Sequence, residues 1–180
     1  MAERLYLVGC GGHGRVVLDA ALACGLAVTG IIDPGLAPGS LVFGVLVLGG
    51  DDYLYQAEAR ACLLNGVGAN PNVARRRGLY DSLSVSHAFV GVRHPGALIN
   101  RPGEIDLSAQ VMAGAIMQPG VVIGPNAVIN TGASIDHDCV LQAHVFVSPR
   151  AVLCGQVQVD EGAFIGAGAI LMPGVRVGAG

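Results

Sequence analysis

A histidine between two aspartates is the strongest candidate for chemistry in this sequence. His137 stands between Asp136 and Asp138, and a carboxylate can orient an imidazole and stabilise its protonated form. Imidazole is the side chain most often used as a general base near neutral pH. The alternative is an exposed turn histidine without a catalytic role. We therefore take His137 as a candidate base, with either Asp136 or Asp138 as its orienting group.

A glycine-rich turn near the N-terminus is the second candidate site. Gly9-x-Gly11-x-x-Gly14 lies between a strand-like run at residues 5–8 and a helix-like segment at residues 15–24, and Asp33 ends the next strand-like segment. Such a turn leaves room for a phosphate at a helix N-terminus and supplies an acid for a hydroxyl or a base edge. A tight turn without a ligand is the alternative. Two details count against an NAD site. His13 would protrude where a pyrophosphate sits, and fewer than about a hundred residues cannot form a full six-stranded dinucleotide domain. We therefore expect one nucleotide half-site.

The first ninety residues alternate between strand and helix. Further strands are expected at residues 27–32, 41–48 and 62–67. Gly25 is a plausible C-cap for the first helix, and Asp51 can N-cap a second helix that runs through about Arg60. Alternating βαβ units predict a parallel sheet flanked by helices, so we assign residues 1–92 to a Rossmann-like α/β domain.

The pattern changes to a six-residue period from about Ile99. Stepping by six from Ile99 to Val177 meets only aliphatic residues and methionine, and a small residue follows four positions after most of them. An exact period of six fits neither an α-helix nor an open sheet, but it fits a parallel β-helix of triangular section. Three hexads make one coil, so residues 18 apart stack about 4.8 Å from each other. His137 should therefore lie one coil from Gly155, whose backbone a ligand can approach closely.

Composition excludes several classes of protein. The 180 residues are 52% hydrophobic and 13% charged, with 28 glycines and a net charge of −3, which fits neither a disordered chain nor a nucleic-acid-binding protein. The longest apolar run, at residues 41–48, is too short to span a bilayer, and no signal peptide is recognisable. Arg75-Arg76-Arg77 is interpreted as a solvated helix face. We expect a cytoplasmic protein with reduced thiols, because the five cysteines form no paired framework.

A metal site is not expected. His144 follows His137 by seven residues and falls on the next face of the β-helix, where it is most simply a surface residue. His87 and His94 precede the clear repeat, and zinc needs three or four convergent ligands. Cys139 occupies an inward small-residue position and is interpreted, like Cys154, as a packing or turn residue.

Three segments resemble a known family. These are Gly11-Gly12-His13-Gly14, His94-Pro95 and the run Ile129-Asn130-Thr131-Gly132-Ala133-Ser134-Ile135-Asp136-His137-Asp138-Cys139. Together they look like the NeuD/PglD-like bacterial sugar O- and N-acetyltransferases, which comprise sialic acid O-acetyltransferases and nucleotide-aminosugar N-acetyltransferases. The resemblance covers nearly the whole chain. It implies that residues 93–180 form a left-handed parallel β-helix of the hexapeptide-repeat acyltransferases, that the protein is a homotrimer, and that acetyl-CoA lies between neighbouring β-helices.

The resemblance also assigns roles to single residues. It implies His137 as the general base, Asp138 as its orienting group and Asn130 as a group that positions the acceptor. The Gly155 amide is implied as a donor to the thioester carbonyl. Phe146, at the position where many relatives have a second histidine near the CoA, is implied as an acetyl-CoA-binding residue. The residues implied to hold a nucleotide-sugar are Gly11, Gly12, His13, Gly14 and Asp33.

The function expected on this basis is acetyl-CoA-dependent acetylation of a sugar, foremost the amine of a nucleotide-linked aminosugar in surface-glycan biosynthesis. O-acetylation of sialic acid is one alternative. Because the chain stops at Gly178-Ala179-Gly180, midway through a coil, the CoA site would be incomplete if the β-helix is truncated. A non-catalytic trimer that binds a nucleotide-sugar is therefore the other alternative. No membrane, nucleic acid or metal partner is expected.

Overall fold

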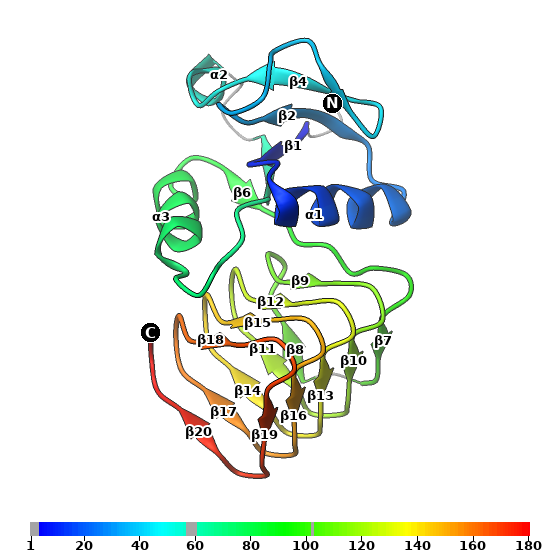
Figure 1. Ribbon diagram of the computed structural model, residues 1–180, viewed down its shortest axis with the longest axis vertical. Coiled ribbons are helices and arrows are strands. Elements are labelled where there is room, and N and C mark those ends of the chain that lie inside the picture. Colours follow the sequence, from blue (N-terminus) through cyan, green and yellow to red (C-terminus); the bar gives the residue numbers. More distant parts are fainter. Residues whose placement is uncertain (1–3, 57–60, 102) are drawn as a thin grey trace.

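The chain folds into an α/β part and a β-helical part that pack against each other (Figure 1). The computed structural model describes residues 4–56, 61–101 and 103–180. The elements of the first part are β1 (Leu5–Val8), α1 (Gly12–Ala23), β2 (Val28–Ile32), β3 (Leu41–Val42), β4 (Val45–Gly49), α2 (Asp52–Gln56), β5 (Cys62–Asn65), α3 (Ala74–Leu83) and β6 (Ala88–Phe89).

The first part is a sheet with helices on both faces, as the alternation of strand and helix predicted. Its strand order is β3-β4-β2-β1-β5-β6, and all neighbours are parallel except β3 and β4. Successive side chains of β1 point to opposite faces. Leu5 and Leu7 pack with the apolar face of α1, whereas Tyr6 and Val8 pack with residues of α2 and α3.

Several details differ from the expected elements. The sheet has six strands, more than the half-site expectation allowed, because two-residue strands suffice to extend each edge. Residues 41–48 form a hairpin instead of one strand, since Phe43 and Gly44 both take positive φ in a tight turn. Helix α1 begins at Gly12, three residues earlier than expected. Helix α2 is described as far as Gln56, and its expected end near Arg60 lies outside the described residues.

The second part is a parallel β-helix, as the six-residue period predicted. Fourteen two-residue strands form three sheets with the orders β19-β16-β13-β10-β7, β20-β17-β14-β11-β8 and β18-β15-β12-β9. The strands are β7 (Leu98–Ile99), β8 (Glu104–Ile105), β9 (Gln110–Val111), β10 (Ile116–Met117), β11 (Val122–Ile123), β12 (Val128–Ile129), β13 (Ser134–Ile135), β14 (Val140–Leu141), β15 (Phe146–Val147), β16 (Val152–Leu153), β17 (Gln158–Val159), β18 (Phe164–Ile165), β19 (Ile170–Leu171) and β20 (Arg176–Val177).

The stacking register follows the sequence period. Residues 18 apart are paired along each face, as in Met117 with Ile135 and Ile135 with Leu153. From Ala109 to Ile165 the periodic aliphatic residues and the small residues four positions later form one continuous buried core, and those of the first and last coils, such as Ile99 and Leu171, are partly buried against it. This arrangement confirms their predicted inward orientation. At the corners, the fourth residue of the hexad takes a left-handed backbone, usually as glycine; Gly120 has a φ of 78°. This recurring turn explains much of the glycine excess.

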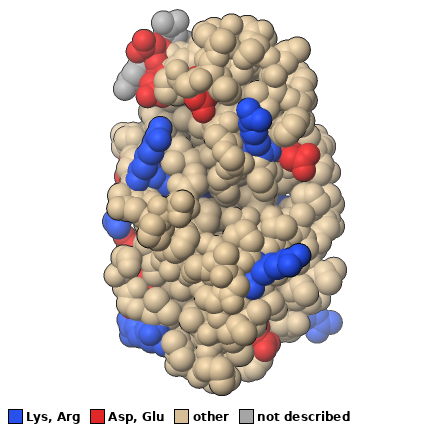
Figure 2. Space-filling model, viewed as in Figure 1, with Lys and Arg blue, Asp and Glu red and all other residues tan. Residues whose placement is uncertain are grey.

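The α/β part rests on one of the three faces of the β-helix. Val73, next to α3, packs with Val128, Phe146 and Phe164 of the sheet β18-β15-β12-β9. This sheet lies beneath α1 and α3 in Figure 1. The other two sheets, and the corner between them, lie away from the α/β part. Charged side chains are sparse on the face drawn in Figure 2.

Candidate active site

His137 lies in the turn between β13 and β14. In Figure 1 the corner between these two strands is on the side of the β-helix away from the α/β part. The Nδ1–H of His137 donates to Oδ2 of Asp138 at 2.9 Å. Asp138 occupies the left-handed turn position, with a φ of 57°, and its own N–H donates to the carbonyl of Pro119 in the preceding coil at 3.1 Å. The turn therefore presents the Asp138 carboxylate to the ring and leaves Nε2 of His137 as the free imidazole nitrogen.

The two aspartates beside His137 make different contacts. Asp136 accepts the backbone N–H of His137 at 2.7 Å, whereas Asp138 bonds the ring. The hydrogen bond to Asp138 raises the pKa of His137 above its ordinary value, and the charge of Asp136 acts in the same direction. Of the two orienting groups that the sequence left open, Asp138 is the one that the structure places on the imidazole.

Gly155 lies against the His137 ring in the next coil. A Cβ added to Gly155 would stand 2.5 Å from Nε2 and 2.7 Å from Cε1 of His137, so a larger residue would displace the imidazole. Within the described part of the chain, the N–H of Gly155 has no hydrogen-bond acceptor. Pro119 and Pro173, which occupy the same column of the corner, have no N–H to offer. The corner thus combines a carboxylate-bound imidazole with an adjacent free amide donor.

The glycine-rich turn forms one wall of a cleft of about 830 Å³. A Cβ on Gly14 would collide with the carbonyl of Gly9, so Gly14 permits close packing of strand and helix, whereas Gly11 and Gly12 have nothing within 4 Å of an added Cβ. We call the cleft of about 830 Å³ the glycine cleft. Its lining residues are Gly9, Gly11, Gly12, His13, Asp33, Pro34, Gly35, Gly66, Val67, Gly68, Ala69, Asn70 and Arg75.

Asp33 ties the glycine turn to the end of β2. Its carboxylate accepts the N–H of Cys10 at 2.5 Å and the N–H of Gly35 at 2.7 Å. Asp33 lines the glycine cleft, and each of its oxygens keeps a further lone pair for a ligand. The residue therefore shapes the turn and is also available to a ligand.

His13 connects the glycine cleft to a second one. Its Nε2–H donates to Oε1 of Gln110 at 3.2 Å, and its ring meets the Phe146 ring edge to face at 5.5 Å between centroids. Burial lowers the pKa of His13 to about 4, and the charge of Arg76 adds to this effect. His13 is therefore neutral at pH 7.

The second cleft, of about 520 Å³, lies between the two parts of the chain. Its lining residues are Gly12, His13, Val16, Gly68, Ala69, Asn70, Asn130, Thr131, Phe146, Ser148, Pro149, Phe164 and Ala167, and we call it the interdomain cleft. Asn130 Oδ1 accepts the N–H of Thr131 at 2.8 Å, which orients its amide. The ring of Phe146 stacks on that of Phe164, with centroids 5.6 Å apart.

The residues predicted from the sequence fall into two groups, apart from Gly14, which packs against the Gly9 carbonyl and lines neither cleft. Gly11, Gly12, His13, Asp33, Asn130 and Phe146 line the two connected clefts next to the α/β part. His137, Asp138 and Gly155 form the corner between the two sheets that the α/β part does not cover. The first group and the second therefore lie on different sides of the same β-helix.

Two of the sequence interpretations are wrong. His144 is only 6% exposed, not a surface residue. Its Nδ1 accepts from the Asn126 amide at 3.0 Å, and its ring packs against Tyr80 of α3. Arg76, expected on a solvated face, is 1% exposed. Its guanidinium donates to the carbonyls of Asn65, Val67 and Asn126. Both residues belong to a polar network that joins the two parts of the chain.

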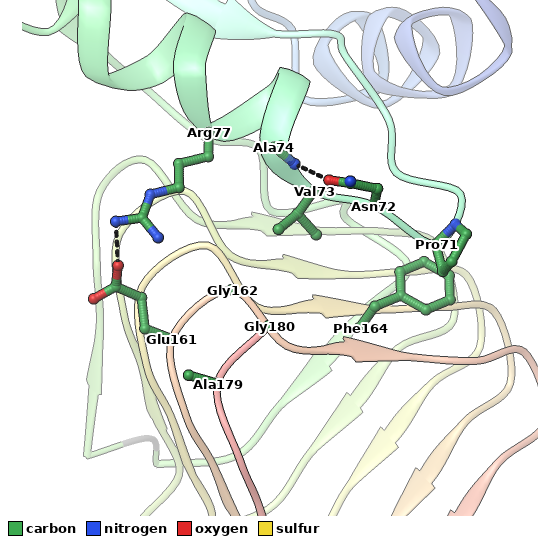
Figure 3. A pocket seen from close by; sticks show the side chains of 10 residues that line it. All are labelled: Pro71, Asn72, Val73, Ala74, Arg77, Glu161, Gly162, Phe164, Ala179 and Gly180. Atoms are coloured by element: carbon green, nitrogen blue, oxygen red, sulfur yellow. Dashed lines mark hydrogen bonds and ion pairs between the residues drawn. The ribbon is translucent and has the colours of Figure 1, made fainter.

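A third cleft, of about 800 Å³, lies between α3 and the last coil and contains none of the predicted site residues (Figure 3). Glu161 in this cleft is paired with Arg77 at 2.6 Å. Among the described residues, no group of three or more histidine, cysteine, aspartate or glutamate side chains could hold a metal ion. No helix in the described ranges is long and apolar enough to cross a membrane.

Comparison with known proteins places this architecture among sugar acetyltransferases. The family model described as the PglD N-terminal domain matches residues 4–83. Perosamine N-acetyltransferase from Caulobacter crescentus, solved as a histidine-to-asparagine variant with CoA and GDP-perosamine, is 35% identical, with a TM-score of 0.82 over 99% of this chain and 84% of that chain. The acetyltransferase domain of PglB from Neisseria gonorrhoeae is 30% identical, with a TM-score of 0.83 over 98% of this chain and 86% of that chain. The same domain is also known in complex with acetyl coenzyme A. No match was found among curated proteins.

The fold and these comparisons together define an acyltransferase built on a left-handed β-helix. The chain belongs to the PglD-like family of sugar N-acetyltransferases, which confirms the expected fold, enzyme class and use of acetyl-CoA.

Proposed function

We propose that this chain transfers the acetyl group of acetyl-CoA to the amine of a nucleotide-linked aminosugar in surface-glycan biosynthesis. The observation that carries the proposal is the corner where the His137 imidazole, held by Asp138, lies against the free amide of Gly155. The substrate class is supported by the perosamine enzyme, which holds CoA and GDP-perosamine.

The chemistry follows from the orientation of the imidazole. Asp138 holds Nδ1–H, so Nε2 can accept a proton from the sugar amine as the amine nitrogen attacks the thioester carbon. The N–H of Gly155 donates to the carbonyl oxygen as negative charge develops on it, a contribution worth about 10²- to 10³-fold in rate at comparable sites. When the carbon–sulfur bond breaks, the proton on His137 passes to the leaving thiolate. The products are the N-acetylated sugar and CoA.

The two clefts supply a place for the acceptor. The nucleotide would occupy the glycine cleft, where Gly11 and Gly12 leave the backbone open and Asp33 offers carboxylate lone pairs. The sugar would extend past His13 into the interdomain cleft, where Asn130 and Phe146 line the wall.

This assignment requires two chains. Because His137 lies at the corner away from the α/β part, a sugar in the interdomain cleft meets the imidazole of a neighbouring chain rather than that of its own. A homotrimer, in which each corner faces the clefts of the next chain, provides this arrangement three times. Acetyl-CoA then lies in the groove between neighbouring β-helices.

The test is CoA release, followed with a thiol reagent, from acetyl-CoA and a panel of nucleotide-aminosugars. We expect release with at least one acceptor and a loss of about 10²- to 10⁴-fold in kcat for His137→Ala. His87→Ala removes a histidine far from the corner and is the matched control. Release with sialic acid but with no aminosugar would reassign the acceptor to a hydroxyl. Binding of a nucleotide-sugar without any CoA release would identify a non-catalytic binding protein.

A further inference from the structure

The three consecutive arginines at the start of α3 have three different environments. Arg76 is buried and donates to backbone carbonyls. Arg77 is paired with Asp81 and with Glu161, the second of these visible in Figure 3. Arg75 is exposed and lines the glycine cleft. Within the described ranges, Arg75 makes no hydrogen bond or ion pair. One guanidinium of the run is thus left free, at the wall of a cleft.

The charge of the glycine cleft depends on Arg75. Among the described residues, the only other charged residue lining it is Asp33, whose carboxylate accepts two backbone N–H groups. Arg75 is therefore the one cation on the wall of this cleft in the described part of the chain.

The neighbouring arginine fixes where this cation stands. Arg76 donates to the carbonyls of Asn65 and Val67 at 3.0 Å and 2.8 Å, which ties the first turn of α3 to the loop after β5. That loop supplies residues 66–70 of the cleft wall. The backbone that carries Arg75 is thus held in a fixed place relative to the glycine cleft.

We propose that Arg75 binds the diphosphate of the nucleotide-linked sugar and makes the cleft selective for diphosphates over monophosphates. The proposal rests on the proposed function and adds a residue and a charge requirement to it. A guanidinium has five N–H donors in a planar fork that matches phosphate oxygens, and each charge-assisted contact is about twice as strong as a neutral one. A second phosphate group gives Arg75 further acceptor oxygens and a further negative charge.

The experiment measures binding of GMP, GDP, UMP and UDP to the full chain by calorimetry. Variants are Arg75→Ala and Arg75→Lys, with Arg77→Ala as the matched control and Arg15→Ala as a test of the other exposed arginine near the glycine turn. We expect the native chain to bind one diphosphate more tightly than its monophosphate. Arg75→Ala should reduce that preference about tenfold, Arg75→Lys should reduce it less, and Arg77→Ala should leave it unchanged. With nucleotide-sugar as substrate, Arg75→Ala should raise KM and leave kcat within about twofold.

The outcomes distinguish the role of Arg75 from the existence of the nucleotide site. An unchanged preference in Arg75→Ala, or a loss in Arg15→Ala alone, would overturn the assignment of Arg75 while leaving the proposed function intact. If the native chain binds neither diphosphate, the nucleotide site itself is wrong and the proposed function falls with it. Thermal unfolding of Arg75→Ala should match the native chain, since the residue is exposed and has no partner in the described ranges.

Discussion

The imidazole of His137 lies against the α-carbon of Gly155, which comes 18 residues later in the sequence and one coil further along the β-helix. The φ of Gly155 is not in the left-handed region, so the backbone does not require glycine there. The His137 imidazole requires glycine at position 155, because a Cβ there would occupy the space of its Nε2 atom. This contact ties the position of the candidate base to the candidate amide donor.

Gly155→Ala should therefore lower kcat while the chain stays folded. The added methyl group would displace the imidazole of His137, and a shift of about 1 Å in a reacting group can cost about 10²-fold in rate. Gly166→Ala is the control, since nothing lies within 4 Å of a Cβ at that corner position. The measurements are kcat from CoA release and the thermal unfolding midpoint. Equal kcat values for the two alanine variants would contradict the role of this contact.

The pH dependence of activity should follow the hydrogen bond between His137 and Asp138. This bond raises the pKa of His137 above 6.5, and a general base must be unprotonated, so kcat/KM should fall as the pH drops through that raised value. Asp138→Asn replaces the carboxylate with a neutral acceptor. The acid limb should then move to lower pH, while the plateau rate also falls. Profiles of both proteins from pH 5 to pH 9 provide the comparison, and an acid limb at the same pH in both would exclude Asp138 as the group that tunes the base.

Stability should fall in mild acid because His13 is held neutral. Its pKa is about 4 in the folded chain, mainly through burial, against about 6.5 in the unfolded chain. Between these values the unfolded state binds more protons, so the free energy of unfolding decreases as the pH falls. The loss between pH 7.5 and pH 4.5 should be about 2 to 3 kcal/mol from this residue.

Urea unfolding of the native chain and of His13→Gln, at one protein concentration and at both pH values, measures this contribution. Glutamine does not titrate, so the variant should lose less stability between the two pH values than the native chain. Some acid sensitivity should remain, because burial also lowers the pKa of His144. If both proteins lost the same free energy of unfolding between the two pH values, His13 would not be the cause of the acid sensitivity.

The β-helix could be predicted from the sequence because every hexad repeats the same pattern of residue types. An aliphatic residue such as Ile129 points inward and a small residue such as Ala133 closes the turn, and neither depends on distant parts of the chain. The stacking of His137 beside Gly155 followed from the period alone. The choice between Asp136 and Asp138 did not, because it depends on which carboxylate the left-handed turn presents to the ring.

The interface between the two parts could not be predicted in the same way. Arg76 and His144 carry polar side chains that usually face solvent, and their burial depends on partners brought together by tertiary packing. The place of Asn130 also depends on tertiary packing, since it lines the interdomain cleft together with His13 of the other part of the chain. No local pattern in the sequence shows that these residues meet across the two parts of the chain.

The central claim is that one acetyl-transfer site is built from the His137 corner of one chain and the clefts of another. Two inactive variants can test it when they are co-expressed with different tags and purified as mixed trimers. One is His137→Ala, and the other is Gly12→Trp, which fills the clefts because both extend over Gly12. Each homotrimer should release no CoA above background in the presence of the aminosugar acceptor.

Every mixed trimer holds two chains of one variant and one of the other, so about one in three of its interfaces should pair an intact corner with intact clefts. CoA release by the purified mixed trimers should therefore return to about a third of the native rate per chain. Mixed trimers that form, bind nucleotide and remain inactive would contradict it, since both halves of the site would then have to come from one chain.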